Sequence, residues 1–125
     1  MSEIIKVSPL SKTWILDLDG TIVKHNGYQI NGFDCFIDGA KEFLEKIPDT
    51  DMVIFITSRE EKYKQITEKF LSENNVRYNS IIYGAPYGER ILINDRKPSG
   101  LCMAMAVSTK RDEICDVKFE TDNTL

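Results

Sequence analysis

The sequence predicts an α/β fold built on a parallel β-sheet. Short, continuously apolar runs of the length of buried strands alternate with segments whose apolar residues recur at helical spacing. Polar residues follow several of the apolar runs directly. Alternation of strand and helix favours right-handed crossovers, a parallel sheet and helices on both of its faces. We therefore expect three layers, in a single domain that spans residues 1–125.

The first strand is expected over Thr13–Leu18, where three apolar residues in a row are typical of a strand buried in a parallel sheet. The following segment, Thr21–Asp34, contains the dipeptides Asn26-Gly27 and Asn31-Gly32. Asn-Gly favours tight hairpin turns, so this segment predicts a small β-flap.

Two further elements follow the flap. A helix is expected from Asp38, as its N-cap, to about Ile47, because apolar residues recur there with the spacing of one helix face. Pro48 ends this helix. The apolar run Met52–Ile56 predicts the second strand.

The next helix and strand are also indicated by local patterns. Ser58 with Glu61 has the spacing of a capping box and opens a long helix that stops at Asn74-Asn75. A short strand is expected over Ile81–Tyr83.

The last third of the chain is less regular. Arg90–Ile93 predicts a further strand, and Leu101–Val107 is compatible with a short helix followed by a strand. An edge strand is expected over Val117–Phe119, before the chain end.

Composition narrows the class of protein. The hydrophobic content of 42% and the charged content of 29% are ordinary for a globular protein. A net charge of −4 disfavours a nucleic-acid partner. No apolar run approaches the roughly 20 residues of a membrane span, and the N-terminus lacks the pattern of a signal peptide. We expect a cytoplasmic protein with no membrane partner.

Zinc chemistry is disfavoured as well. Cys35, Cys102 and Cys115 are widely spaced, and His25 is the only histidine. The cysteines are expected to be free thiols in a reducing compartment. His25 is expected in a loop, where it either has no role or contacts substrate.

Two acids, Asp17 and Asp19, directly follow the first apolar run. Side chains alternate along a strand, so both carboxylates point to one side while Leu18 points into the core. Gly20 then permits a sharp turn. Two carboxylates so close repel each other unless a cation lies between them, and Mg²⁺ is the cation that carboxylates share with a phosphate.

The run Asp17-Leu18-Asp19-Gly20-Thr21 resembles the first motif of the haloacid dehalogenase-like (HAD) phosphohydrolases. The resemblance implies that Asp17 is the nucleophile and Asp19 the general acid/base, and that both are ligands of Mg²⁺, Asp19 also through its carbonyl. Thr57 resembles the family's second motif, whose hydroxyl binds a phosphoryl oxygen. The implied fold is a three-layer, Rossmann-like one.

The later motifs match the family less closely. Asn94-Asp95 resembles the fourth motif, in which acids complete the metal site, so both residues are expected metal ligands. The third motif is a lysine that neutralises phosphoryl charge, and its usual Gly-Lys-Pro is here Gly84-Ala85-Pro86. Lys97 is the expected replacement, with Arg96 as the competitor.

The resemblance implies a Mg²⁺-dependent phosphate monoester hydrolase. No insertion is long enough for a cap domain, and the chain is similar to the short, capless phosphatases of capsule and polysaccharide biosynthesis. A sugar phosphate is the first expected substrate. An open site also suits a phosphorylated macromolecule, or closure by a second copy of the chain. The expected substrate contacts are Gly20, Thr21, Ser58 and Arg59, with Tyr28, Tyr83 and Tyr87 as possible entrance residues.

Two other hypotheses of function compete with that of a phosphatase. A signalling receiver domain requires a phosphoacceptor Asp after a middle strand, where this chain has Thr57-Ser58. A binding or regulatory protein on a decayed phosphatase fold would explain Ala85 and Asn94. Mg²⁺-dependent phosphate release distinguishes an enzyme from a binding protein.

Overall fold

The computed structural model describes residues 3–125, which form parts of two compact units. The larger unit comprises residues 11–86 and 109–114. The smaller unit comprises the N-terminal residues to Leu10, residues 87–108 and residues 115–125.

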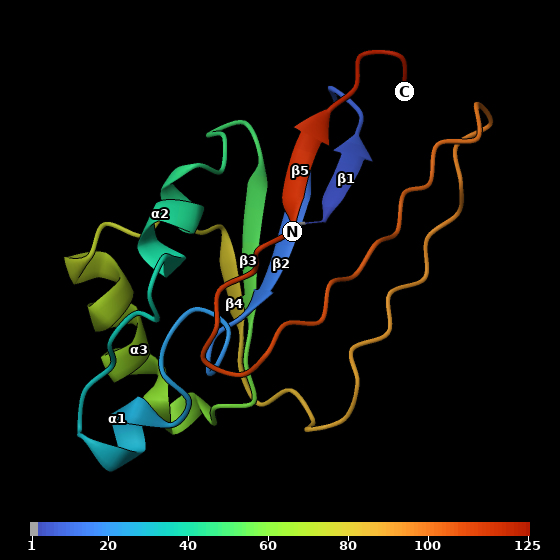
Figure 1. Ribbon diagram of the computed structural model, residues 1–125. Helices are drawn as coiled ribbons and strands as arrows, with labels where there is room; N and C mark the ends of the chain where they lie inside the picture. Colours follow the sequence, from blue (N-terminus) through green and yellow to red (C-terminus); the bar gives the residue numbers. More distant parts are fainter. Residues whose placement is uncertain (1–2) are drawn as a thin grey trace. The chain divides into compact units, whose positions relative to one another are not determined.

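A parallel sheet of three strands forms the centre of the larger unit (Figure 1). Its strands are β2 (Thr13–Asp17), β3 (Met52–Ile56) and β4 (Ser80–Ile82), in that order. All three strands were predicted from apolar runs, and their parallel pairing confirms the α/β class. The register pairs Asp17 with Ile56, so β2 and β3 end at the same edge of the sheet.

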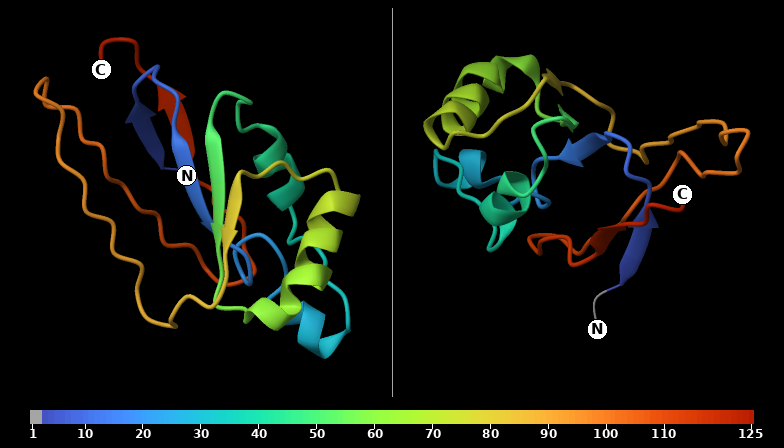
Figure 2. Two further views of the ribbon diagram at one scale, coloured as in Figure 1. Left: turned by 180° about the vertical axis from the view of Figure 1, so that it is seen from behind. Right: turned by 90° about the horizontal axis from the view of Figure 1, so that it is seen from above.

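Helices lie on one side of this sheet (Figures 1 and 2). They are α1 (Gly27–Ile30), α2 (Ala40–Glu45) and α3 (Lys64–Glu73), and α3 is preceded by the 3₁₀ turn η1 (Glu61–Tyr63). Side chains that alternate away from the helices are partly open to solvent, with Ile15 at 51% and Ile82 at 50% exposure. The predicted third layer is therefore not confirmed in this unit.

The core of the larger unit lies between the sheet and its helices. Val53 and Phe55 of β3 face the helices and are 2% and 0% exposed. Leu71 of α3 and Ala40 of α2 are completely buried against them. The remaining buried members of this cluster are Leu18, Ile22, Val23, Ile37 and Ile47.

Three local predictions in this unit are wrong. The expected β-flap forms α1 and one isolated antiparallel bridge, because Asn26 adopts a left-handed conformation that opens a helical turn. Gly39, not Asp38, is the N-cap of α2. The helix expected at Ser58 begins at η1, whose N-cap Glu60 makes no side-chain capping hydrogen bond.

The smaller unit contains one parallel pair of strands. β1 (Ile4–Val7), which was not predicted, pairs with β5 (Lys118–Thr121), which overlaps the predicted edge strand. Lys6 and Glu120 form an ion pair across this pair of strands.

Residues 87–108 of the smaller unit form no helix or strand. The strand predicted at Arg90–Ile93 is therefore wrong, as is the regular structure predicted at Leu101–Val107. Ile91 and Ile93 are 83% and 89% exposed, because no neighbouring strand pairs with this run. A turn in which Lys97 N–H donates to Leu101 O at 3.0 Å reverses the chain.

Among residues 3–125, no helix has the length and apolar character needed to cross a membrane.

Candidate functional site

The turn after β2 displays the two acids of the first motif. The Leu18 carbonyl accepts hydrogen bonds from the N–H groups of three successive residues, Thr21, Ile22 and Val23, at 2.9–3.2 Å. Leu18 itself is 1% exposed and belongs to the core. Gly20 has φ +84°, a conformation that side chains disfavour, and its N–H donates to Val23 O at 2.7 Å. The tight turn thus fixes the backbone on both sides of Asp19.

Asp17 and Thr57 terminate neighbouring strands. The hydroxyl of Thr21 donates to Asp17 Oδ2 at 3.0 Å, so this residue contacts the predicted nucleophile. Thr57 directly follows β3, and its backbone is held by Ile82 O and Ala85 N–H at 2.9 and 3.0 Å. The Thr57 side chain is buried, and its Oγ1 accepts a hydrogen bond from Arg59 N–H at 3.1 Å. These contacts place Asp17 and Thr57 at one edge of the sheet, as predicted.

Arg59 forms two bidentate ion pairs at this edge. Its Nε and Nη2 donate to the two oxygens of Asp19 at 3.0 and 2.9 Å. Its Nη1 and Nη2 donate to the two oxygens of Asp34 at 3.0 and 2.7 Å. The side chains of Arg59 and Asp34 are each 1% exposed, whereas that of Asp19 is 15% exposed. Asp19 is therefore the member of this group that solvent reaches.

The remaining contacts of Arg59 come from α3 and α1. Nη1 also donates to Thr67 Oγ1 at 2.8 Å, and the Tyr28 ring centroid lies 3.9 Å from Cζ. Burial lowers the pKa of Arg59, but its hydrogen bonds to Asp19 and Asp34 outweigh that effect and raise the pKa above its ordinary value. A guanidinium in this setting stays charged.

The oxygen atoms of Asp17 and Asp19 decide whether this edge of the sheet suits Mg²⁺. Within residues 3–125, no three His, Cys, Asp or Glu side chains form a group suited to a metal. Both Asp19 carboxylate oxygens are hydrogen-bonded to Arg59, which leaves the Asp17 carboxylate and the Asp19 carbonyl as donors. Mg²⁺ usually keeps several waters and takes one or two carboxylates plus a substrate phosphate. The two donors fit an ion held in that way.

The other predicted residues divide between the two units. Ser58 lies between Thr57 and Arg59 at the end of β3, and Gly20 lies in the turn. Asn94, Asp95 and Lys97 belong to residues 87–108 of the smaller unit, where Asn94 Nδ2 contacts Asp95 O at 3.1 Å. Their roles as metal ligands and phosphoryl-binding lysine stay predictions.

Neither a family model, nor a curated protein, nor a solved structure is similar to this chain at a significant level. The assignment of function therefore depends on the residues themselves.

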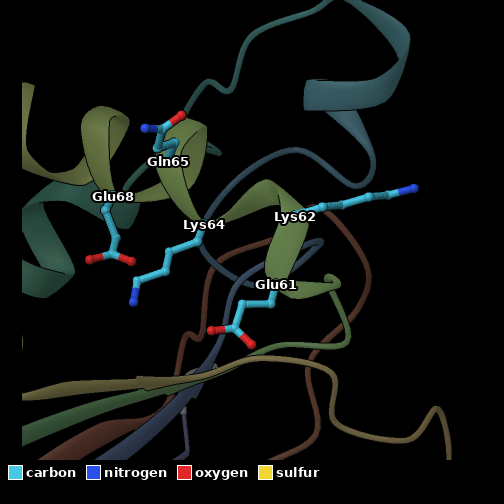
Figure 3. A pocket seen from close by; sticks show the side chains of 5 residues that line it. All are labelled: Glu61, Lys62, Lys64, Gln65 and Glu68. Carbon is cyan, nitrogen blue, oxygen red and sulfur yellow. The ribbon is translucent and has the colours of Figure 1, made fainter.

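A separate polar hollow of about 410 Å³ lies over η1 and the start of α3 (Figure 3). Its described lining includes none of the predicted site residues. It consists of charged and amide side chains of both signs: Glu61, Lys62, Lys64, Gln65 and Glu68. This mixture gives no preference for an anion or a cation.

Sequence reasoning missed two parts of the site. Asp34 is 25 residues from Arg59 along the chain, and no motif links them. Residues 109–114 are the other part, since Asp112 N–H donates to Gly20 O at 2.7 Å. The only available signal was the position of Arg59 directly after a strand end, which placed it among the predicted substrate contacts.

Proposed function

We propose that this chain is a cytoplasmic, Mg²⁺-dependent phosphate monoester hydrolase that acts through an aspartyl-phosphate on Asp17. The observation that carries the proposal is the common end of β2 and β3, where Asp17 is the last residue of β2 and Thr57 directly follows β3. Ligands of open α/β sheets bind beyond the carboxyl ends of the strands. The resemblance of Asp17–Thr21 to the first HAD motif supports the same assignment.

In the first half of the reaction, an Asp17 oxygen forms a bond to phosphorus. The bond from phosphorus to the ester oxygen breaks, and that oxygen takes a proton from Asp19, which enters the reaction in its acid form with one of its two hydrogen bonds from Arg59 released. In the second half, a water oxygen attacks phosphorus, its proton goes to Asp19, and the bond to Asp17 breaks. Inorganic phosphate leaves, and both acids return to their starting states.

The surrounding residues orient these two acids. Thr21 holds the Asp17 carboxylate by a hydrogen bond, and Arg59 holds the Asp19 carboxylate by two. Because all five N–H groups of Arg59 have partners within the protein, we propose a positioning role for it in place of the predicted substrate contact. The Asp17 carboxylate and the Asp19 carbonyl would hold Mg²⁺, which would supply positive charge to offset the negative charge of the phosphoryl group. The roles of Asn94, Asp95 and Lys97, which the resemblance implies, stay predictions.

A small phosphorylated metabolite, first of all a sugar phosphate, is the proposed substrate. The sequence leaves no room for a cap domain, so selectivity depends on the loops at the sheet edge. A panel of sugar phosphates, nucleotides and a chromogenic phosphate ester tests this proposal.

A binding or regulatory protein is the second candidate. The observation in its favour is that Arg59 already occupies both oxygens of the Asp19 carboxylate. A protein of this class would bind a phosphorylated ligand and release no phosphate.

The deciding experiment compares Asp17→Asn with the native chain. We expect the native chain to release phosphate with Mg²⁺ and to stop when a chelator is added. Asp17→Asn should lose at least about 10³-fold in kcat, because an amide is not a nucleophile toward phosphorus. Asp49→Asn, whose side chain is fully exposed in the native chain, removes the same charge and should retain full activity. Native turnover in Asp17→Asn overturns the proposal.

A further inference from the structure

Residues 109–114 are anchored on the turn that carries the two acids. Asp112 N–H donates to Gly20 O at 2.7 Å, and His25 N–H donates to Asp112 Oδ1 at 2.8 Å. Ile114 packs against the core and lies 3.2 Å from the position that a Cβ on Gly39 would take. The segment is thus attached at the turn and at the core. Arg111 directly precedes Asp112 in this segment.

Arg111 lies directly against Gly20. A Cβ added to Gly20 would be 3.2 Å from Arg111 Cγ, and 3.8 Å from His25 Cβ and Nδ1. Only glycine leaves this space to the arginine stem, and φ +84° at Gly20 independently disfavours a side chain. The absence of a side chain at Gly20 therefore allows both the tight turn and the close contact with Arg111.

The guanidinium of Arg111 is available for a ligand. Arg111 is exposed, and within residues 3–125 its side chain has no hydrogen bond or ion pair. Arg59, the buried cation of this site, is fully engaged by Asp19 and Asp34. A bound phosphate ester adds negative charge to a turn that already carries Asp17 and Asp19.

We propose that Arg111 binds the phosphoryl oxygens of the ligand at the Asp17 turn, an inference that rests on the proposed function. The planar guanidinium fork matches phosphate oxygens and stays charged at any working pH. Arg111 supplies this charge from within the larger unit, whatever the contribution of Lys97. The ligand class is a phosphate monoester or free phosphate.

The test uses Arg111→Ala and, as a matched control, Lys110→Ala. Lys110 is the adjacent exposed cation, and none of the three atoms nearest to the Gly20 Cβ position belongs to it. Binding of inorganic phosphate in the presence of Mg²⁺ is measured by calorimetry, and KM is measured on any ester that the native chain hydrolyses. We expect Arg111→Ala to weaken phosphate binding by roughly tenfold to hundredfold, the effect of a lost charge-assisted hydrogen bond. Lys110→Ala should change it by about twofold at most. Arg111→Lys, which keeps the charge but not the fork, should fall between them.

The outcomes separate this inference from the proposed function. Equal phosphate binding by Arg111→Ala and native protein overturns the role of Arg111, while native turnover keeps the phosphatase assignment. Weaker phosphate binding by Arg111→Ala without native turnover supports the role of Arg111 and overturns catalysis. Absence of phosphate binding by the native chain overturns the role of Arg111. Unchanged Trp14 fluorescence confirms that Arg111→Ala is folded.

Discussion

At the scale of single residues, Arg59 fixes the orientation of the Asp19 carboxylate. Each of its two bidentate pairs fixes a carboxylate in the plane of the guanidinium. Removing one partner of such a buried pair costs about 3–5 kcal/mol, because the other charge is left uncompensated. Lysine cannot replace this contact, since a compact ammonium group has no planar fork. Arg59 therefore links the stability of the larger unit to the orientation of Asp19, the proposed catalytic acid.

The variant Arg59→Lys tests this link. We expect kcat to fall by about hundredfold, because misplacing a catalytic group by roughly 1 Å has an effect of that size. KM should change little, since substrate does not contact Arg59 in the proposed site. Steady-state kinetics on the best ester of the panel provide both values.

Asp34→Asn is the control for Arg59→Lys. It disturbs the buried partner of Arg59 and leaves the bidentate pair with Asp19 in place. Both variants should unfold at lower temperature than the native chain, but Asp34→Asn should keep most of kcat. An equal loss of kcat in both variants would show that Arg59 acts on stability alone.

Sequence patterns located some site residues and not others. Asp17, Gly20 and Thr57 follow strands that the apolar runs predict, so their shared sheet edge was foreseeable. The pairing of Arg59 with Asp34 was not, because it joins the end of β3 to the loop after α1. Contacts between distant side chains depend on packing, which periodicity does not contain.

At the scale of elements, α3 is joined to the sheet by two tyrosines. Tyr83 Oη donates to Glu68 Oε2 at 3.0 Å, and Tyr78 Oη lies 3.5 Å from Glu68 Oε1. Burial, and then the hydrogen bond and the negative charge of Glu68, raise the pKa of Tyr83. The protonated phenol is thus favoured in the folded protein.

This shift predicts a loss of stability at alkaline pH. Below the tyrosine pKa of the unfolded chain, about 10, Tyr83 is protonated in both the folded and the unfolded state. The Tyr83–Glu68 contact then makes its full contribution to the free energy of unfolding. As pH rises above that value, the unfolded state loses its proton first, and the contribution decreases towards the folded pKa. The free energy of unfolding, measured with urea, should decrease less between pH 8 and pH 11 in Tyr83→Phe than in the native chain. An identical decrease in both chains contradicts a role for the Tyr83–Glu68 contact.

Element prediction succeeded where an apolar run had neighbours to pair with. β2 and β3 are five-residue runs that pair along their whole length. The shorter run at Arg90–Ile93 has the same local character but finds no strand partner. Asn26-Gly27 predicted a hairpin turn that does not form. An Asn in the left-handed conformation is also compatible with the start of a helical turn, and Asn26 is the N-cap of α1. Local propensity does not distinguish these outcomes, and tertiary contacts decide them.

At the scale of the whole molecule, Trp14 reports on the unit that carries the site. It is the only tryptophan in the sequence and lies in β2, three residues before Asp17. Its Nε1 donates to Asp51 Oδ2 at 2.9 Å, and its ring meets Phe43 edge-on at 6.0 Å. Unfolding of the larger unit removes both contacts. Trp14 fluorescence therefore follows the stability of this unit in the full chain.

A ligand that binds only the folded state raises its stability by an amount fixed by concentration and affinity. The increase is about 2.7 kcal/mol when the ligand concentration is 100 times Kd. Beryllofluoride with Mg²⁺ mimics an aspartyl-phosphate, so it should bind at Asp17. We expect it to raise the Trp14 melting temperature of the native chain, and a chelator to reverse the rise.

Two comparisons make this prediction specific to Asp17. Mg²⁺ with fluoride but no beryllium should shift the transition far less, because no phosphoryl mimic forms. Asp17→Asn should show no shift with the complete mixture, since an amide does not replace the carboxylate oxygen bonded to beryllium. The same rise in Asp17→Asn would place the mimic elsewhere on the molecule. The sheet edge formed by β2 and β3 would then not be the phosphoryl site, even if the chain hydrolysed an ester.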